Sequence, residues 1–209
     1  MKGLFITLEG GEGAGKSTLI KGLCAHLSAK GIPFVQTRAP GATSFGEKIR
    51  SLLLHEEKKL ENRSELFLFL ADRADHVATI IVPALTQGKI VICDRYNDST
   101  VAYQGVARGL DSVLVRELCS FATDGLEPDL TFYLDIDPVV GLKRALLHTG
   151  TKDRVESEDL LFHQKIRSAF HEIAHKEPGR VRTLDATQTP EILLEQTIDV
   201  LYAFSTTYR

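Results

Sequence analysis

Mostly apolar runs of four or five residues alternate along this chain with longer segments in which apolar residues recur every three or four positions. Such runs, rich in β-branched and aromatic side chains, predict strands that are buried on both faces. We expect strands at residues 4–8, 34–37, 90–93, 130–134 and 181–184. Because strands alternate with helices, the pattern predicts an α/β fold with a parallel five-stranded sheet and helices on both faces.

Helical spacing of apolar residues fills the segments between these runs. We expect helices at residues 16–30, 46–54, 62–87, 112–123, 138–148, 157–176 and 190–204. The first should end at Gly31, and Pro83 should kink the last turn of the third. No internal repeat, low-complexity segment or linker interrupts the pattern, so we expect a single domain over residues 1–209.

The most specific motif joins the first predicted strand to the first predicted helix. Residues 10–17, Gly10-Gly11-Glu12-Gly13-Ala14-Gly15-Lys16-Ser17, match the phosphate-binding pattern GxxxxGK[ST] at every fixed position, and Thr18 follows. Glycines allow backbone N–H groups to point at a phosphate, and the helix N-terminus adds partial positive charge. Lys16 should reach the β- and γ-phosphates, and Ser17 should hold Mg²⁺. The motif therefore predicts a P-loop NTPase-type sheet that binds a nucleoside triphosphate.

A second candidate site lies at the end of the third predicted strand. Ligands of parallel sheets bind beyond the carboxyl ends of the strands, where Asp94 and Arg95 follow residues 90–93. An aspartate in this place is typical of a carboxylate that organises Mg²⁺ through water, and Arg95 can hold phosphate oxygens bidentately. A structural ion pair between Asp94 and Arg95 is the alternative.

The polar segment at residues 149–155 predicts a short basic lid. It contains Lys152 and Arg154, and it follows a helix that carries Lys143 and Arg144. Phosphoryl transfer needs positive charge on the transferring group, and the variable positions of the phosphate loop supply none. We therefore expect Arg154 to act in catalysis from the lid. A solvated loop is the alternative.

Composition and charge argue against several other classes of protein. A net charge of −3 lacks the excess of positive charge that is typical of proteins that bind nucleic acid or anionic membranes. No apolar run is long enough for a membrane span. The three cysteines, Cys24, Cys93 and Cys119, are odd in number and far apart, which is typical of core packing rather than of disulfides or a metal site. We expect a cytoplasmic protein.

One further motif belongs to another chemistry. Residues 171–175, His-Glu-Ile-Ala-His, match the zinc-protease pattern HExxH, with Glu195 downstream as a possible third ligand. At 100° per residue, His171 and His175 fall opposite the apolar stripe of their helix, so we expect them in solvent and favour no zinc site. The remaining histidines are also expected at the surface: His26, His55, His76, His148 and His163.

Taken together, these residues resemble the thymidylate kinase family over nearly the whole chain. The segments that carry the resemblance are residues 9–17, 37–41, 69–73, 94–104, 128–135, 141–144, 153–156 and 185–186. The phosphate loop identifies only the superfamily, whereas residues 94–104 and the Phe69/Arg73 pair are more specific. A phosphate loop without arginine, combined with a basic lid, is similar to the bacterial type.

The resemblance implies an enzyme that transfers the γ-phosphoryl group of ATP to dTMP, giving dTDP, with Mg²⁺. Phe69 would stack on thymine, and Arg73, four residues later on the same helix face, would hydrogen-bond the base. Thr100 and Gln104 would complete base recognition, and Tyr103 would crowd the 2′ position of the sugar. A core aromatic is the alternative role for Phe69.

The resemblance also implies how the phosphates and the sugar are held. Arg38 and Arg95 would bind the phosphate of dTMP, and Glu12 would lie near the 3′-hydroxyl. Arg144, with residues 185–186, would lie by the adenine of ATP. The family usually forms a homodimer through helices, with each active site inside one protomer.

Two departures from the family pattern bear on these roles, and two other functions stay open. Ala39 stands where a glutamate is usual, which affects the orientation of Arg38, and Val139 stands where an acidic residue is usual. The alternatives are a kinase for another nucleotide or nucleoside and a non-enzymatic nucleotide switch. The sequence has neither the NKxD base-reading motif of GTPase switches nor the second loop lysine of partition-type ATPases.

Overall fold

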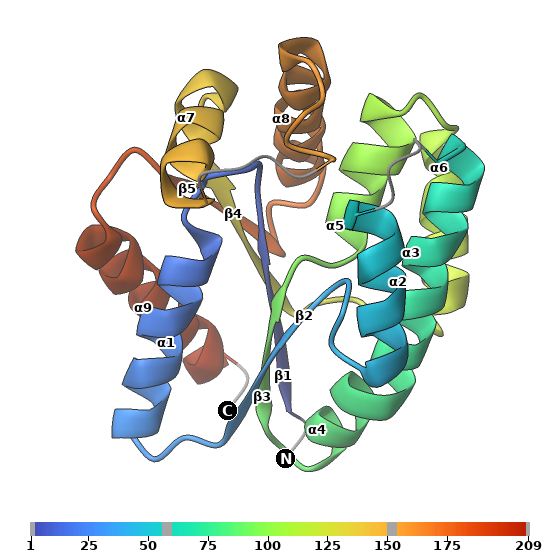
Figure 1. Ribbon diagram of the computed structural model, residues 1–209. Coiled ribbons are helices and arrows are strands. Elements are labelled where there is room, and N and C mark those ends of the chain that lie inside the picture. Colours follow the sequence, from blue (N-terminus) through green and yellow to red (C-terminus); the bar gives the residue numbers. More distant parts are fainter. Residues whose placement is uncertain (1–2, 56–59, 150–153, 208–209) are drawn as a thin grey trace.

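The computed structural model describes residues 3–55, 60–149 and 154–207. Within these ranges five parallel strands form one sheet in the order β2-β3-β1-β4-β5 (Figure 1). The strands are β1 (Leu4–Glu9), β2 (Phe34–Arg38), β3 (Ile90–Asp94), β4 (Leu130–Asp135) and β5 (Val181–Asp185). The predicted parallel sheet is confirmed, and each strand extends one residue beyond its predicted end.

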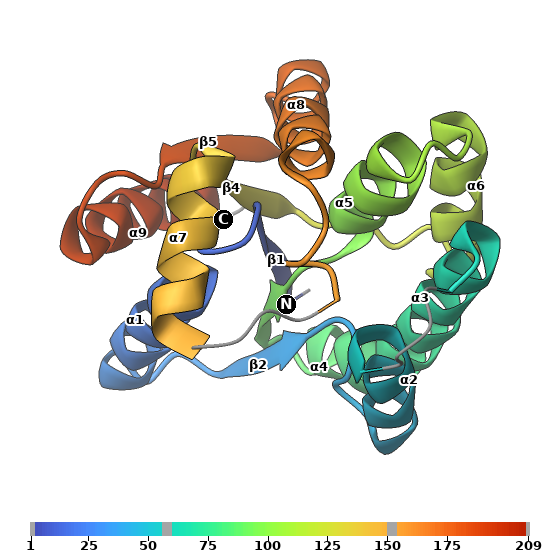
Figure 2. The ribbon, with the colours of Figure 1, turned by 45° about the horizontal axis from the view of Figure 1, so that its top comes forward.

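Helices surround the sheet, and two of the helical segments, η1 and η2, are π-helical (Figures 1 and 2). The helical elements are α1 (Lys16–Ala29), α2 (Ser44–His55), α3 (Asn62–His76), η1 (Val77–Ile81), α4 (Val82–Thr86), α5 (Asn97–Thr100), η2 (Val101–Ala107), α6 (Ser112–Ala122), α7 (Pro138–Thr149), α8 (Leu160–Lys176) and α9 (Pro190–Thr207).

Alternate residues of the strands pack on opposite faces, as the period of a strand requires. Helices α1 and α9 cover one face and bury Ile6 of β1 and Phe132 of β4. On the other face, Phe5 and Val91 pack against η1 and α4. A third apolar cluster joins α3, η2, α6 and α8 beside Tyr133. Because both faces are covered, the strands read as nearly continuous apolar runs.

The carboxyl ends of the strands meet at one edge of the sheet. In the strand register Asp94 of β3 lies opposite both Leu8 of β1 and Arg38 of β2, and Asp135 of β4 lies opposite Asp185 of β5. The phosphate loop follows β1 at this edge. The predicted ligand-binding residues that follow the strands are therefore brought together by the sheet itself.

The helix predicted over residues 62–87 is divided into α3, η1 and α4. Pro83 has no N–H to donate and occupies the first turn of α4. The π-helical turn η1 lies directly before that turn, and such turns are a known cause of helix kinks. The sequence predicted a kink at Pro83, and the structure has a π-helical turn directly before the turn that contains Pro83.

Sequence reasoning missed the helical segment formed by α5 and η2. Residues 97–105 are all buried, and several of them are polar. A segment that is buried on every side lacks the amphipathic periodicity from which a surface helix is predicted.

The predicted lid lies only partly within the described residues. Lys152 falls outside them, whereas Arg154 is described. Helix α8 begins at Leu160 rather than near residue 157, because the carboxylate of Asp159 accepts the N–H of Phe162 and caps the helix. No helix in the described ranges is long and apolar enough to cross a lipid bilayer.

Candidate active site

The phosphate loop joins β1 to α1 as predicted. Gly13 and Gly15 have positive φ angles of 66° and 93°, in the left-handed region that glycine enters without strain. A Cβ atom on Gly13 would overlap the carbonyl oxygen of Gly141 in α7. The loop therefore needs glycine at this position both for its backbone conformation and for its contact with α7.

Lys16 is buried at the start of α1 and turns back over the loop. Its Nζ donates to the carbonyl oxygens of Gly10 and Gly11 at 2.9 and 3.0 Å. Burial, and then the nearby guanidinium of Arg95, lower the pKa of Lys16. The next residues, Ser17 and Thr18, are exposed at the mouth of the loop.

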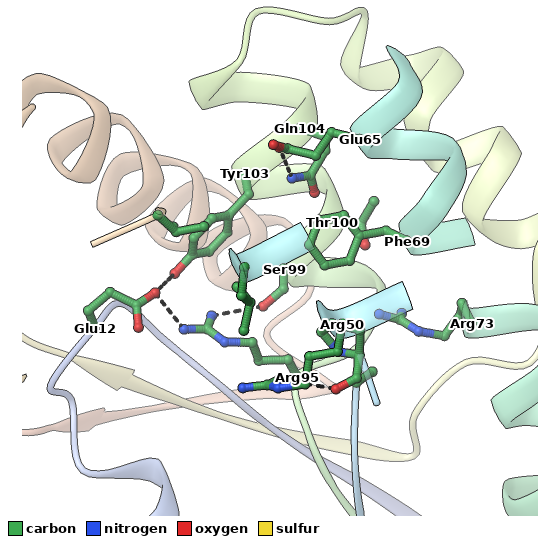
Figure 3. Close-up of a pocket in the computed structure, with 14 residues that line it drawn as sticks. Glu12, Arg50, Glu65, Phe69, Arg73, Arg95, Ser99, Thr100, Tyr103 and Gln104 are labelled. Atoms are coloured by element: carbon green, nitrogen blue, oxygen red, sulfur yellow. Dashed lines mark hydrogen bonds and ion pairs between the residues drawn. The ribbon is translucent and has the colours of Figure 1, made fainter. Parts of the chain in front are cut away.

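Glu12 connects the loop to the helical side of the site (Figure 3). Its Oε1 accepts from Arg95 Nη2 at 2.8 Å and from the Tyr103 hydroxyl at 2.7 Å. Burial by itself raises the pKa of Glu12, but Arg95 and Lys16 outweigh this effect and lower the pKa to about 2. The carboxylate is therefore ionised and accepts hydrogen bonds only.

Arg95 reaches from the end of β3 to the phosphate loop. Its Nη1 donates to Gly10 O at 3.0 Å and to Ser99 Oγ at 3.2 Å, and its guanidinium lies 5.0 Å from the Tyr103 ring centre. The residue has a φ of 68°, which is uncommon outside glycine. Its backbone N–H donates to Leu8 O at 3.0 Å, which holds the strained turn in place.

Glu9 stabilises the backbone turn at Arg95, a role that the sequence did not reveal. Its fully buried carboxylate accepts from the Tyr96 N–H at 2.6 Å and from Ser99 Oγ at 2.5 Å. Burial and the nearby Asp98 raise the pKa of Glu9 to about 7. Through Ser99, Glu9 helps to fix the position of the Arg95 guanidinium.

Asp94 and Ser17 lie at the same edge of the sheet and suit a magnesium ion. The Asp94 Oδ1 atom is buried and makes no hydrogen bond to any described residue. A carboxylate oxygen left in this way fits a water of the Mg²⁺ hydration shell, because Mg²⁺ is usually held by few protein ligands. The alternative of an Asp94–Arg95 ion pair is not what the structure has, since the ion pair of Arg95 is with Glu12.

A pocket opens beside the phosphate loop, between the β2–α2 connection, α3 and the α5–η2 segment (Figure 3). Its lining residues are Glu12, Ala39, Pro40, Arg50, Leu54, Glu65, Phe69, Arg73, Arg95, Ser99, Thr100, Tyr103, Gln104 and Val155. Seven of the eight residues predicted to bind the acceptor are among them, and Arg38 is not. Sequence reasoning missed Arg50 and Glu65, which gave no recognisable pattern on their helices.

Phe69 and Arg73 approach the pocket from α3. Leu66 and Leu70 of this helix belong to the apolar core, whereas Phe69 is half-buried and faces the pocket. Arg73 is 2% exposed, and its Nη1 donates to Asn97 Oδ1 at 2.6 Å. The Arg73 Nε atom makes no hydrogen bond to any described residue. It is a buried donor that a ligand in the pocket could use.

Comparison with known proteins settles which family shares this arrangement. The family model for thymidylate kinase matches residues 8–197. This chain belongs to the thymidylate kinase family. The thymidylate kinase of Protochlamydia amoebophila is 45% identical over 208 residues, covering 96% of this chain and 92% of its own, and that of Solidesulfovibrio magneticus is 47% identical over 199 residues, covering 92% and 95%. The crystal structure of thymidylate kinase from Ehrlichia chaffeensis superposes with a TM-score of 0.77 at 33% identity, covering 96% of this chain and 99% of that one.

The enzyme is therefore a nucleoside monophosphate kinase that transfers the γ-phosphoryl group of ATP to dTMP and gives dTDP. This agrees with the function that the sequence implied. The P-loop NTPase-type fold is likewise that of thymidylate kinase.

Three other arginines that the sequence singled out have hydrogen-bond partners different from those of Arg95. Arg38 is exposed, and its Nε donates to Gly41 O at 3.2 Å. Arg144 Nη1 donates to Ala186 O at 2.8 Å, so these two predicted neighbours do lie together. Arg154 donates from Nε to Leu53 O at 2.8 Å and from Nη2 to Glu65 Oε2 at 2.6 Å. In this conformation Arg154 contacts α2 and α3, the latter at a residue that lines the pocket.

The predictions for the histidines were partly wrong. His76 is fully buried and bonds to Thr37 Oγ1 at 2.6 Å, and burial lowers its pKa to about 4. His163 is also buried, because it lies on the inner face of α8. The side chains of His55 and His148 lie outside the described residues.

In the HExxH motif, His171 and His175 are exposed, as expected. His171 Nε2 lies 3.2 Å from Asp135 Oδ1. Over the described parts of the chain, no three histidine, cysteine, aspartate or glutamate side chains gather into a metal-binding group.

Proposed function

We propose that dTMP binds in the pocket beside the phosphate loop, with its phosphate toward Arg95 and its base toward Phe69. One observation carries this proposal: Glu12 is a residue of the phosphate loop and also lines the pocket. A nucleotide in the pocket would therefore have its phosphate next to the triphosphate of ATP. Such proximity is what a direct transfer requires.

The pocket offers a suitable group for each part of the nucleotide. The Phe69 ring would stack on thymine, Arg73 would donate to a carbonyl oxygen of the base, and Thr100 and Gln104 would complete the contacts. The Tyr103 hydroxyl is held on Glu12 and would crowd a 2′-hydroxyl, which favours deoxyribose.

ATP would occupy the phosphate loop of residues 10–18, with Lys16 exchanging its carbonyl contacts for phosphate oxygens. Ser17 and, through water, Asp94 would hold Mg²⁺, which neutralises charge on the phosphates when it is bound. Arg144 would lie by the adenine. A non-enzymatic switch would have no use for the acceptor pocket.

Three arginines would bear on the transferred group and its acceptor. Arg95 links the phosphate loop, Ser99 and Glu12 through both of its terminal nitrogens, so these nitrogens are placed where they would hold phosphate oxygens bidentately. Arg38, at the carboxyl edge of β2, would bind the dTMP phosphate from the rim. Arg154 would exchange its contact with Glu65 for the transferring phosphoryl group when both substrates are bound.

Binding of dTMP to a Phe69→Ala variant tests the pocket assignment. We expect calorimetry to give a dissociation constant for dTMP at least about tenfold weaker than that of the wild type, with ATP binding unchanged. Phe45→Ala is the matched control, because Phe45 is exposed on α2 and does not line the pocket. Equal dTMP affinity in all three proteins would refute the assignment.

We also infer that the kinase is a homodimer formed by α3 and α6. These helices contact each other and lie side by side at one side of the molecule (Figures 1 and 2). They carry four exposed apolar side chains: Phe67, Val113, Leu114 and Phe121. Phe121 is 87% exposed, which is costly for a phenylalanine unless a partner covers it.

Light scattering after gel filtration tests the dimer. The wild type should have twice the mass of one chain, and Phe121→Asp should shift it toward the monomer. Leu147→Asp is the control, since Leu147 is 78% exposed on α7, a helix that lies on another side of the molecule from α3 and α6 (Figure 1). A monomeric wild type would contradict the inference.

We further propose the cytoplasm as the compartment. The three cysteines support this proposal because they are buried and form no disulfide.

A further inference from the structure

Glu65 lies in the wall of the pocket, and its carboxylate joins three parts of the chain. The side chain is 2% exposed. Its Oε1 accepts from Gln104 Nε2 at 2.8 Å and from Arg108 Nε at 3.1 Å, and its Oε2 accepts from Arg154 Nη2 at 2.6 Å. Glu65 therefore links α3 to η2 and to Arg154 of the predicted lid.

Two guanidinium groups keep this carboxylate ionised. Burial raises the pKa of Glu65, but the hydrogen bonds from Gln104 and Arg154 and the charge of Arg108 outweigh it and lower the pKa. Arg108 is itself held by Glu158 and lies with its guanidinium 4.5 Å from the centre of the Phe162 ring. An ionised carboxylate has no proton to donate, so every group that faces Glu65 must be a donor.

This requirement decides the orientation of the Gln104 amide. A glutamine side chain has an NH₂ group that donates and a carbonyl oxygen that accepts. Because the NH₂ group must face Glu65, the carbonyl oxygen is the atom left for the pocket that Gln104 lines (Figure 3). Gln104 is 3% exposed, so few other partners compete for that oxygen.

An acceptor at this point of the pocket distinguishes pyrimidine bases. Thymine carries an N–H donor at ring position 3, whereas cytosine carries an unprotonated nitrogen there. A fixed carbonyl oxygen accepts a hydrogen bond from the N–H of thymine. With cytosine the same oxygen would face the unprotonated ring nitrogen, and two acceptors that face each other weaken binding.

We propose that Glu65 is a positioning residue for base selection, because it fixes the Gln104 amide with its carbonyl oxygen toward ring position 3 of the base. This inference rests on the proposed placement of dTMP in the pocket. In Glu65→Gln an amide replaces the carboxylate, so the residue can face Gln104 with either a donor or an acceptor. The Gln104 amide is then free to rotate so that its NH₂ group and its carbonyl oxygen exchange places.

The test compares dTMP with 5-methyl-dCMP, which keeps the 5-methyl group and the sugar phosphate but carries an unprotonated nitrogen at ring position 3 and an amino group at position 4. For the wild type, kcat/KM should be at least about tenfold lower with 5-methyl-dCMP than with dTMP, because its ring nitrogen and the Gln104 carbonyl oxygen are two acceptors that face each other. For Glu65→Gln the ratio of kcat/KM for dTMP to that for 5-methyl-dCMP should fall by at least about threefold, with the KM for ATP unchanged, because the effect of the position-4 amino group is the same in both enzymes. A general loss of stability would lower kcat/KM for both substrates alike and leave the ratio of the two values unchanged.

Gln104→Leu and the double variant complete the cycle. Gln104→Leu should also lower the ratio, and adding Glu65→Gln to it should change the ratio no further. If Glu65→Gln fails to fold, Glu65→Asp keeps the charge, withdraws the acceptor from Gln104 and should lower the ratio as well.

Two results overturn the proposal in different ways. A ratio unchanged by Glu65→Gln or Glu65→Asp but lowered by Gln104→Leu would refute the role of Glu65 and leave the dTMP pocket standing. A Gln104→Leu variant with the wild-type ratio and wild-type KM for dTMP would refute the pocket assignment on which the role depends.

Discussion

The guanidinium of Arg95 lies 2.8 Å from the carboxylate of Glu12, one residue at the end of β3 and the other on the phosphate loop. Both side chains are 19% exposed, so the pair is screened little by water but still opens onto the pocket. In the proposed complex the pair would lie where the phosphate of the acceptor meets that of ATP. The positive charge of Arg95 would then be at the point of transfer.

Arg95→Ala should lower kcat by about a thousandfold or more, because an arginine that stabilises the transferring phosphoryl group contributes on this scale. The loss of Arg95 also removes the ion-pair partner of Glu12, which leaves an uncompensated carboxylate that repels phosphate. Steady-state kinetics with saturating ATP and dTMP measures the effect. Arg63→Ala, which removes an exposed arginine on α3, should keep the wild-type kcat. An Arg95→Ala enzyme within a few-fold of the wild type would contradict this role.

Lys16→Met should likewise lower kcat by orders of magnitude while the fold is retained. The lysine charge is lost, and so are its two bonds to the loop carbonyls, so the affinity for ATP should also fall. Lys21→Met on the exposed side of the same helix is the control. A kcat for Lys16→Met equal to that of Lys21→Met would contradict the role of Lys16 in phosphoryl transfer.

Arg154→Ala should reduce kcat more than it raises KM for either substrate. We expect this because Arg154 contacts Glu65 in the present conformation and would reach the phosphoryl group only during transfer. The structure shows Arg108 still bound to Glu65, so the pocket wall should survive the change. A raised KM with an unchanged kcat would make Arg154 a binding contact instead.

The buried Glu9 should make the stability of the kinase depend on pH. Its pKa is raised to about 7, so between about pH 4.5 and 7 the folded chain holds a proton that the unfolded chain releases. The contribution of Glu9 to the free energy of unfolding therefore falls as the pH rises through this interval.

Urea unfolding at pH 5 and pH 8 measures this dependence. The stability of the wild type relative to Glu9→Gln should decrease from pH 5 to pH 8, because glutamine does not titrate. Glu172→Gln, which changes an exposed glutamate on α8, should show no such trend over the same range. A constant difference between the wild type and Glu9→Gln would contradict the assigned pKa.

The parallel sheet and the phosphate loop could be predicted because their signals are local. Apolar runs mark strands that are covered on both faces, and the loop pattern places glycines where the backbone must turn, as at Gly13. Asp94 and Arg95 could be singled out because a strand end in a parallel sheet is a ligand site. These predictions needed no knowledge of distant contacts.

Glu9, Glu65 and the α5–η2 segment could not be predicted in the same way. Glu9 and Glu65 act through partners about 90 and 40 residues away, and nothing near either one in the sequence indicates that pairing. The segment is buried on every side and so shows no helical period. Burial of His76 and His163 was missed because their neighbours in the fold, such as Thr37 and Glu12, are also distant in the sequence.

The requirement for dTMP is tested by ADP production in a coupled assay with ATP and Mg²⁺ and with dTMP, dUMP, AMP, thymidine or no acceptor. We expect turnover that depends on dTMP and falls steeply with AMP, with thymidine and without an acceptor, because the proposed contacts of Phe69, Arg73, Tyr103 and Gln104 fit thymine on a deoxyribose phosphate. With dUMP, which lacks only the 5-methyl group, kcat/KM should fall by about tenfold or more. ATP consumption that is equal with and without an acceptor would contradict this requirement and would leave only the phosphate loop with a function.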